Sequence, residues 1–409
     1  MSMEVIKADF VMTTPMFLGE ASGPSGVQCA QLIRPPSLKG ALRFWWRALQ
    51  WAAIRHQESS EAAALSELHK QEAALFGQTA KTDANGHMNG GQGQFLLRLH
   101  KQKVGEPTDK DFTLGKAPLQ YLLGQGLFSY KTKLQRQYLQ AGGSFTVELA
   151  LKPGISSAQR QQLLDTLECF GLLGGLGSRA RKGYGSVSLT HLEDAGQTIT
   201  LPDSASAFKR RIQSLASDAL TAIPGQEEPP FSAFSNKTCI QIAQSGANGL
   251  SLLNQHGYEM GMYRGYGREG VTFGGKAEQK FKQDHDWAYA VAKGKRQNTL
   301  PKRIAFGLPH PYFLSSGAKI SVDVTDHNGG NARRASPLLA HIHQLPDGQC
   351  LLIHLVLKAR FLPSEMSVDV KGDGAKFNLK GKQVDASVDW IVLDNFLDRF
   401  QDKDTIHHG

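Results

Sequence analysis

The order of apolar and polar residues predicts a regular set of elements in the first half of the chain. Residues 4–12 alternate, with Ile6, Ala8, Phe10 and Met12 on one face, which is typical of a strand. Helices are predicted over 38–57, capped by Ser37 after two prolines, and over 61–76. The same patterns predict strands at 94–101 and 144–152, a helix at 157–173 and a strand at 186–192. This is the β-α-β-β-α-β order of a ferredoxin-like domain with insertions, among them a glycine-rich loop at 79–93 that we expect to be mobile.

A similar but weaker pattern follows a Pro-, Gly- and Glu-rich stretch at 221–235, which reads as a linker. We expect a strand at 237–243, a glycine-rich segment at 257–275, a helix at about 276–293, strands near 318–325 and 350–361, a helix at 388–401 and a frayed tail. The string Lys182-Gly183-Tyr184-Gly185 recurs as Arg264-Gly265-Tyr266-Gly267, which fits two related domains. The prediction is therefore an α+β fold of two ferredoxin-like (RRM-like, split βαβ) domains. They span 1–222, with a glycine-rich loop at 171–185, and 236–409, joined by a linker at 223–235.

Composition narrows the class of protein. Of 409 residues, 40% are hydrophobic, which excludes disorder for most of the chain, and the longest apolar run, 351–357, is broken by His354. Because the first residues also lack the pattern of a secretory signal, we expect a cytoplasmic protein with no membrane partner. The cysteines Cys29, Cys169, Cys239 and Cys350 are too far apart for a metal knuckle, and no cofactor is expected. The net charge of +9 and the 43 glycines favour a polyanionic partner.

The predicted first helix carries a basic stripe. Lys39, Arg43 and Arg47 are four residues apart, and no acid occurs between Arg34 and Gln57. Such a stripe suits phosphates in single file, because each arginine offers a planar, bidentate fork. A solvated helix face is an equally weighted alternative.

The loop before the last strand of the first domain is a second basic candidate. Arg179, Arg181 and Lys182 lie among glycines that allow backbone amides to approach a phosphate chain, and Tyr184 is available for stacking on a base. The segment 175–180 fits a dinucleotide-binding pattern, but it follows a helix and precedes a strand, so this context argues strongly against a nucleotide-binding role. Residues 182–187 resemble the start of the RNP1 string of RNA recognition motifs, with Ser186 in the place of one aromatic. A tight helix-to-strand connection with exposed basic residues remains the alternative.

Other basic and histidine residues add candidates of lower specificity. Arg264 repeats the position of Lys182, and Arg333 with Arg334 forms a basic pair, so these three are further candidates for RNA binding. His285 is a conceivable general base for a metal-free ribonuclease, although a structural histidine is the simpler interpretation. His341 and His343 share a face, but no third metal ligand is near them in sequence.

Several strings resemble the RAMP superfamily, and more narrowly the first RAMP subunits of the type III-B CRISPR effector. These strings are TTPMFLGEA, RPPSLKGALRFWWRAL, ALFG, GGLGSRARKGYGSV, GLPHPYF and RRASPL, of which PSLKGALRFWWRAL is the most specific. The chain departs from the family at Leu18-Gly19-Glu20-Ala21, where relatives often carry a second glycine.

The resemblance implies two ferredoxin-like domains and a non-catalytic, RNA-binding subunit. It implies a place at the end of the complex that holds the 3′ portion of the guide RNA, contact with other RAMP subunits, and help in binding target RNA, while other subunits cleave. A RAMP-family endoribonuclease that processes guide RNA is the enzyme alternative, and a cap that contacts only proteins is the third. The basic groups suggest a single cleft formed by Lys39, Arg43 and Arg47 together with Arg179, Arg181 and Lys182.

Overall fold

The first sheet confirms the predicted order of the N-terminal half. The computed structural model describes residues 4–19, 30–82, 88–124, 126–224, 227–372, 376–385 and 388–409. Its first sheet runs β4-β7-β1-β8-β9, with antiparallel neighbours. The strands are β1 (Val5–Met12), β4 (Phe95–Lys103), β7 (Ser144–Leu151), β8 (Val187–Asp194) and β9 (Gln197–Thr198). Without the short β9, this is the strand order of a ferredoxin-like domain.

Two helices cover the inner face of this sheet. They are α1 (Pro35–Gln57) and α4 (Ser157–Leu173), and Ile6, Ala8, Phe10 and Met12 of β1 are fully buried as the alternation predicted. Helix α1 begins earlier than predicted: Arg34 is its N-cap, and Ser37 lies inside the first turn. Two prolines occupy its first positions, where a missing N–H costs nothing, so they start the helix instead of preceding it. Helix α2 (Glu61–Phe76) is capped by Ser60 and packs on α1.

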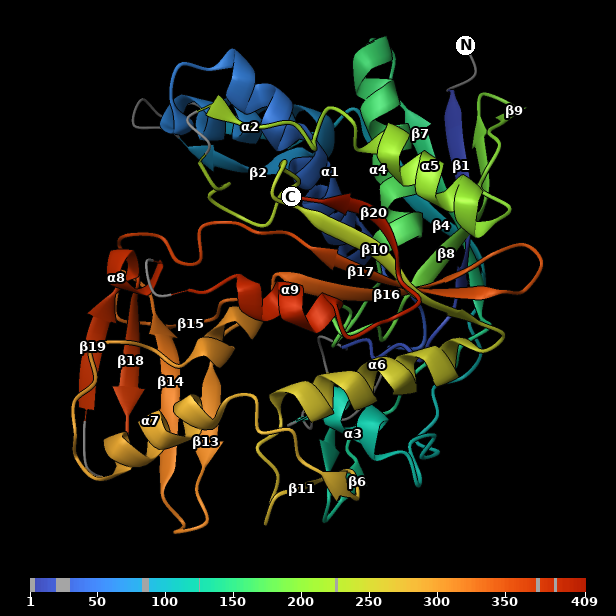
Figure 1. The fold of residues 1–409 in the computed structure, drawn as a ribbon. Helices are drawn as coiled ribbons and strands as arrows, with labels where there is room; N and C mark the ends of the chain where they lie inside the picture. Colours follow the sequence, from blue (N-terminus) through green and yellow to red (C-terminus); the bar gives the residue numbers. More distant parts are fainter. Residues whose placement is uncertain are drawn as a thin grey trace.

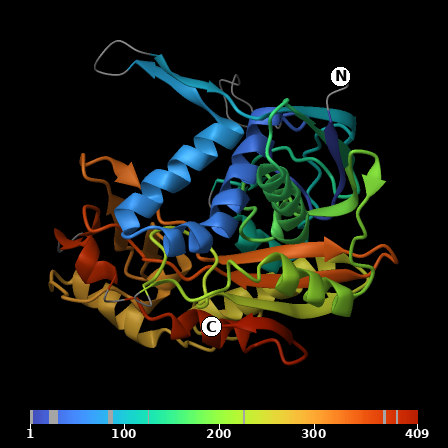
Figure 2. The ribbon, with the colours of Figure 1, turned by 90° about the horizontal axis from the view of Figure 1, so that it is seen from above.

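The segment expected to be a mobile loop at 79–93 forms a hairpin. Strands β2 (Gly77–Thr82) and β3 (Met88–Gln92) pair antiparallel, and Figure 2 shows them projecting away from the body of the molecule. Residues 83–87 lie outside the described part. The polar, glycine-rich composition therefore belongs to a protruding hairpin, whose base contacts α2 and Arg43 of α1.

The C-terminal half repeats the same topology. Its sheet runs β16-β17-β10-β20, formed by β10 (Cys239–Gly246), β16 (Leu338–Gln344), β17 (Cys350–Val356) and β20 (Asp404–His408). Helices α6 (Gly249–Arg264) and α9 (Ile391–Leu397) complete the second β-α-β-β-α-β unit. The expected frayed tail is wrong, because its residues pair with β10 as an edge strand.

Helix α6 was missed because its glycines suggested a loop. The glycine-rich segment at 257–275 begins inside this helix. A Cβ on Gly257 would lie 2.6 Å from the carbonyl oxygen of Pro118, so the glycine lets helix α3 (Ala117–Leu123) approach closely. Glycine here serves close packing between helices.

Two insertions in the C-terminal domain build a third sheet (Figure 1). The first insertion holds β11 (Val271–Thr272), β12 (Gly275–Lys276), α7 (Lys282–Ala292), a 3₁₀ helix (Lys302–Phe306), β13 (His310–Phe313), β14 (Lys319–Thr325) and β15 (Asn331–Ala332). The second holds β18 (Ser367–Lys371), β19 (Lys376–Lys380) and α8 (Gly381–Asp385). Strand β14 pairs with β18, so the two insertions share one sheet and one apolar core.

The predicted linker packs against α1. Phe231 contacts Trp51 edge-on at 5.3 Å between ring centroids, and Phe234 is fully buried beside Trp45. This segment adds apolar side chains to the core of the first domain. The domain boundary at 223–235 stays a prediction. Helix α5 (Ala205–Leu215) precedes it and packs on α4. No helix in the described ranges is long and apolar enough to cross a membrane.

Side-chain hydroxyls join the two domains along β16. The Oγ of Ser186 accepts from the backbone N–H of Ile342 at 3.1 Å, and Ser188 Oγ accepts from that of Gln344 at 2.8 Å. The hydroxyl of Thr13 donates to the carbonyl oxygen of Ile342 at 2.6 Å. Because Ser186 and Ser188 are buried, these bonds satisfy backbone groups that water cannot reach.

Candidate nucleic-acid interface

The basic stripe of α1 lies on one helix face, but an acid of the next helix neutralises part of it. The buried Glu72 of α2 accepts from Arg43 Nη1 at 2.7 Å and lies 3.7 Å from Arg47 Nε. Arg43 also donates to the carbonyl oxygen of Gly77 and lies over the ring of Phe76. Two of the three cations therefore tie α1 to α2.

Lys39 is the member of the stripe that forms no ion pair with another described residue. It lies 5.5 Å from the centre of the Phe95 ring, and burial lowers its pKa, helped by the nearby charges of Arg43 and Lys152. Lys39 and Arg43 line a cavity of about 520 Å³ with residues of β2, β3 and β4. Its described lining includes no residue of the loop at 171–185.

Truncation of Arg43 is expected to weaken the fold. Arg43→Ala removes the closest partner of a buried carboxylate, and we expect a loss of about 2 kcal/mol in the free energy of unfolding, since Arg47 still reaches Glu72. Arg47→Ala, which removes a longer and more exposed contact, should cost less than about 1 kcal/mol. Urea unfolding of both variants measures the difference; equal effects would mean that Glu72 does not depend on Arg43.

The glycine-rich loop is anchored by helix α3. Arg179 Nε donates to the carbonyl oxygen of Leu123 at 2.7 Å, and Lys182 Nζ donates to that of Leu122 at 3.1 Å. These carbonyls belong to the last turn of α3, which has no intrahelical donor for them and where cations are favoured. Arg181 Nη1 donates to the carbonyl oxygen of Ser336, and its guanidinium lies 5.2 Å from the ring centre of Phe44.

Tyr184 does not offer a stacking surface. Its side chain is fully buried, its hydroxyl donates to the carbonyl oxygen of Leu119 at 2.8 Å, and its ring contacts Phe17 edge-on. Burial raises the pKa of its hydroxyl well above the usual value. The expected base contact is therefore wrong for this conformation, because the ring fills the core between the loop and α3.

Basic residues of both domains meet around this loop. We call Arg179, Arg181, Lys182, Arg264, Arg333 and Arg334 the seam cluster. Burial, together with the charge of Arg334, lowers the pKa of Arg181 to about 10. Burial lowers the pKa of Lys182 to about 7, with added repulsion from Arg264 and Arg179. The pKa of Arg179 is lowered by burial and by the charges of Arg333 and Arg136.

The charged neighbours that shift these three pKa values are all cations. A concentration of like charge costs free energy unless a polyanion compensates it. Arg264 lies over the ring of Phe306, and its side chain makes no hydrogen bond or ion pair within the described residues. Arg333 is exposed. The seam cluster therefore keeps donors available for phosphate oxygens.

The two predicted basic groups do not share one cavity. Lys39 and Arg43 lie in the cavity beside the β2–β3 hairpin, whereas the loop residues contact α3 and the C-terminal domain. Their connection is the contact between Arg181 and Phe44 of α1. Arg136, which follows the short pair β5 (Phe128–Ser129) and β6 (Lys133–Leu134), was not predicted, since a single arginine there carries no pattern.

The three histidines that the sequence singled out pack against other side chains. The ring of His285 stacks on Tyr266 at 4.0 Å between centroids. His341 and His343 are buried, and burial is the main reason that their pKa values are lowered. Across the described ranges, no group of three or more His, Cys, Asp or Glu is placed to hold a metal ion.

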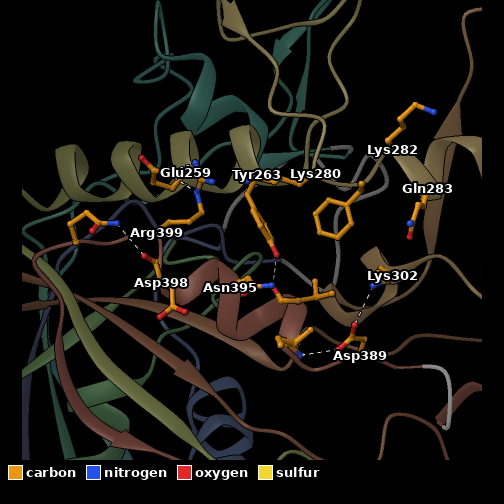
Figure 3. A pocket seen from close by; sticks show the side chains of 14 residues that line it. Glu259, Tyr263, Lys280, Lys282, Gln283, Lys302, Asp389, Asn395, Asp398 and Arg399 are labelled. Carbon is orange, nitrogen blue, oxygen red and sulfur yellow. Dashed lines mark hydrogen bonds and ion pairs between the residues drawn. The ribbon is translucent and has the colours of Figure 1, made fainter.

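A larger cavity of about 920 Å³ lies between α6, α9 and the start of α7 (Figure 3). Its charged groups are largely paired with each other: Arg399 bonds Glu259 and Glu278, and Lys302 lies 3.4 Å from Asp389. This internal pairing makes the cavity a poorer phosphate site than the seam cluster.

Comparisons with known proteins agree with the topology. Residues 10–188 match the model of the RAMP superfamily. The fold matches the crystal structure of Cmr1 from Pyrococcus furiosus in the apo form, with a TM-score of 0.56 and 15% identity over 99% of each chain. A chain of the type III-B Cmr-beta complex bound to cognate target RNA gives a TM-score of 0.48 and 11% identity, over 98% of this chain and 99% of that chain. No curated protein matches the sequence. The RAMP match bears out the predicted superfamily resemblance for residues 10–188, and the Cmr1 structure confirms the α+β fold.

Proposed function

We propose that this chain takes the place of Cmr1 in a type III-B CRISPR effector, as a non-catalytic subunit that holds RNA. The seam cluster is the observation on which the proposal rests. Its cations come from both domains, and the charged groups close to Arg179, Arg181 and Lys182 are also cations. The RAMP match and the Cmr1 fold support the proposal. In this role the chain contacts other RAMP subunits, lies near the 3′ portion of the guide RNA and helps to bind target RNA.

Phosphates are the expected partners of the seam cluster. Guanidinium groups bind phosphate oxygens in a bidentate manner, and contacts to the backbone do not read sequence. Binding should therefore depend strongly on salt and weakly on base sequence. Target choice is then left to base pairing with the guide.

Loss of Arg264 and Arg333 tests this role without breaking the anchors of the loop. We expect the double variant R264Q/R333Q to bind single-stranded RNA about tenfold more weakly and to release fewer counterions, with a salt slope lower by about one. The control R98Q/R210Q removes two charges outside the cluster and should bind as the parent does. Fluorescence anisotropy at two salt concentrations provides both quantities.

Equal weakening in the two double variants would contradict the proposal, because it would reflect net charge alone. The same samples on a denaturing gel distinguish the enzyme alternative. Cleaved RNA, abolished by His285→Ala, would support a guide-processing nuclease instead. No binding at all would favour a cap that contacts only proteins.

A further inference from the structure

Three aromatic rings gather beside the seam cluster, on the outer side of the contact between α3 and α6. Phe273, in the turn between β11 and β12, lies 6.0 Å from Tyr121 of α3 and 6.0 Å from Tyr258 of α6, measured between ring centroids. We call these three residues the ring group. Its members come from both domains, and Tyr258 is 38% exposed.

The backbone holds Phe273 in this place. Its φ of +50° is in the left-handed region, which a residue with a side chain rarely adopts. The ring lies against α6 at Gly261, where a Cβ would be 2.2 Å from the nearest ring atom. The turn and the helix glycine thus keep an apolar ring at a partly exposed position.

The ring group and the seam cluster are neighbours through two helices. Tyr121 directly precedes Leu122, whose carbonyl oxygen accepts from Lys182. Tyr258 and Arg264 belong to the same helix, about 9 Å apart along its axis at 1.5 Å per residue. Six residues also turn the helix by about 600°, so Tyr258 and Arg264 point to different sides of α6. RNA whose phosphates lie on the cluster would therefore reach the rings by extending a base around this helix.

Aromatic surfaces beside a basic groove bind unpaired bases. Each base has a flat π-face, so stacking contributes about 1–3 kcal/mol per base with little regard to sequence. Charged residues adjoin the rings: Arg268 and Lys276, before and after Phe273 in the chain, are both exposed, and Glu269 lies 3.8 Å from Nε of Arg268. A hydrophobic protein interface would instead be depleted in charge at its centre.

We propose that Tyr121, Tyr258 and Phe273 form a binding site for one unpaired nucleobase of the RNA held by the seam cluster. The inference rests on the proposed function. It adds a contact that phosphate binding does not supply, because the rings bind a base and hold it out of the stack of its neighbours.

Oligouridine that carries a single 2-aminopurine tests the site with the full-length protein. Stacking on tyrosine or phenylalanine should quench the fluorescence of this purine when the RNA binds. Tyr258→Leu keeps an apolar side chain but removes the π-face, so quenching should be lost and affinity should fall about tenfold. Tyr258→Phe should retain both. The control Tyr289→Leu removes another exposed tyrosine, on α7, and should leave both unchanged.

The two proposals fail in different ways. Salt-dependent binding without quenching, or quenching unaffected by Tyr258→Leu, would overturn the base site and leave the phosphate site standing. The salt slope should stay unchanged in Tyr258→Leu, in contrast to R264Q/R333Q, because a base contact releases no counterions. Absence of any RNA binding would overturn both. Thermal unfolding of each variant verifies that the fold is retained.

Discussion

Lowering the pH from 7 to 5 should destabilise this protein by about 4 kcal/mol, because two buried histidines cannot accept protons while the chain is folded. Burial lowers the pKa of His343 to about 4, against a hydrogen bond to the backbone of Gly171 that raises it. Burial and the charge of Lys182 lower the pKa of His256 to about 3. His343 faces Phe208 and His341, and His256 faces His354 and Phe396.

The sign follows from the two titrations. An unfolded histidine titrates near 6.5, so below that pH the unfolded chain binds protons that the folded chain excludes until about pH 4. Stability is therefore present above pH 6.5 and is lost as the pH falls, by about 2 kcal/mol per histidine at pH 5. His341 and His354, whose pKa values are also lowered, add to the loss in the same direction.

Urea unfolding at pH 7, 6 and 5 measures this loss. His343→Leu should reduce the loss of stability between pH 7 and pH 5 by about 2 kcal/mol, because the unfolded chain then has one fewer histidine to protonate. His69→Leu, a change on the exposed side of α2, should leave the pH dependence unchanged. An equal stability at pH 7 and pH 5 would mean that the buried histidines are protonated in the folded protein.

Replacement of Ser186 is expected to have the second large effect. Its hydroxyl donates to the carbonyl oxygen of Gly183 at 3.0 Å and accepts from the N–H of Ile342. Ser186→Ala leaves the buried N–H of Ile342 unpaired, whereas the Gly183 carbonyl keeps its bond from the Thr14 hydroxyl at 2.7 Å. We expect a loss of about 1–3 kcal/mol. Ser186→Phe restores the aromatic of the RNP1 string, but the position is 1% exposed, and a phenyl ring there should prevent the domains from packing.

Unfolding in urea compares these variants with Ser251→Ala and Ser251→Phe, at an exposed position of α6. Both controls should stay close to the parent in stability. A stable Ser186→Phe protein would show that the junction between β8 and β16 can open without cost. It would also mean that packing between the domains does not explain why Ser186 stands where the RNP1 string has an aromatic residue.

Periodicity identified the first domain well because its elements bury one face each. β1 and the first part of β7 alternate between buried and more exposed positions, and the two strands pair directly in the sheet. The second domain was harder, since β16 and β17 are buried on both faces and show no alternation. The third sheet could not be predicted, because its central strands β14 and β18 come from separate insertions.

The candidate site was predictable in its charges and less so in its geometry. Glycines near Arg179 and Lys182 marked the loop on which the proposed seam cluster is built, and the repeated string marked Arg264. Glu72, which neutralises Arg43, belongs to α2 and not to the helix that carries the basic stripe, so the stripe alone does not predict this ion pair. The burial of Tyr184 depends on α3, an element that the sequence did not reveal. The ring group joins residues more than 130 positions apart, and no local pattern connects them.

The pairing of β14 with β18 also constrains the order in which the chain can fold. Thr325 and Ser367 are register partners, yet the whole β16–β17 hairpin lies between them in sequence. Closing that loop from an open chain costs more entropy than closing it after the hairpin has drawn its ends together. The third sheet therefore forms most readily on a C-terminal domain that already has its central strands. We therefore expect this sheet to form late in folding, and its stability to depend on the C-terminal domain from which its strands extend.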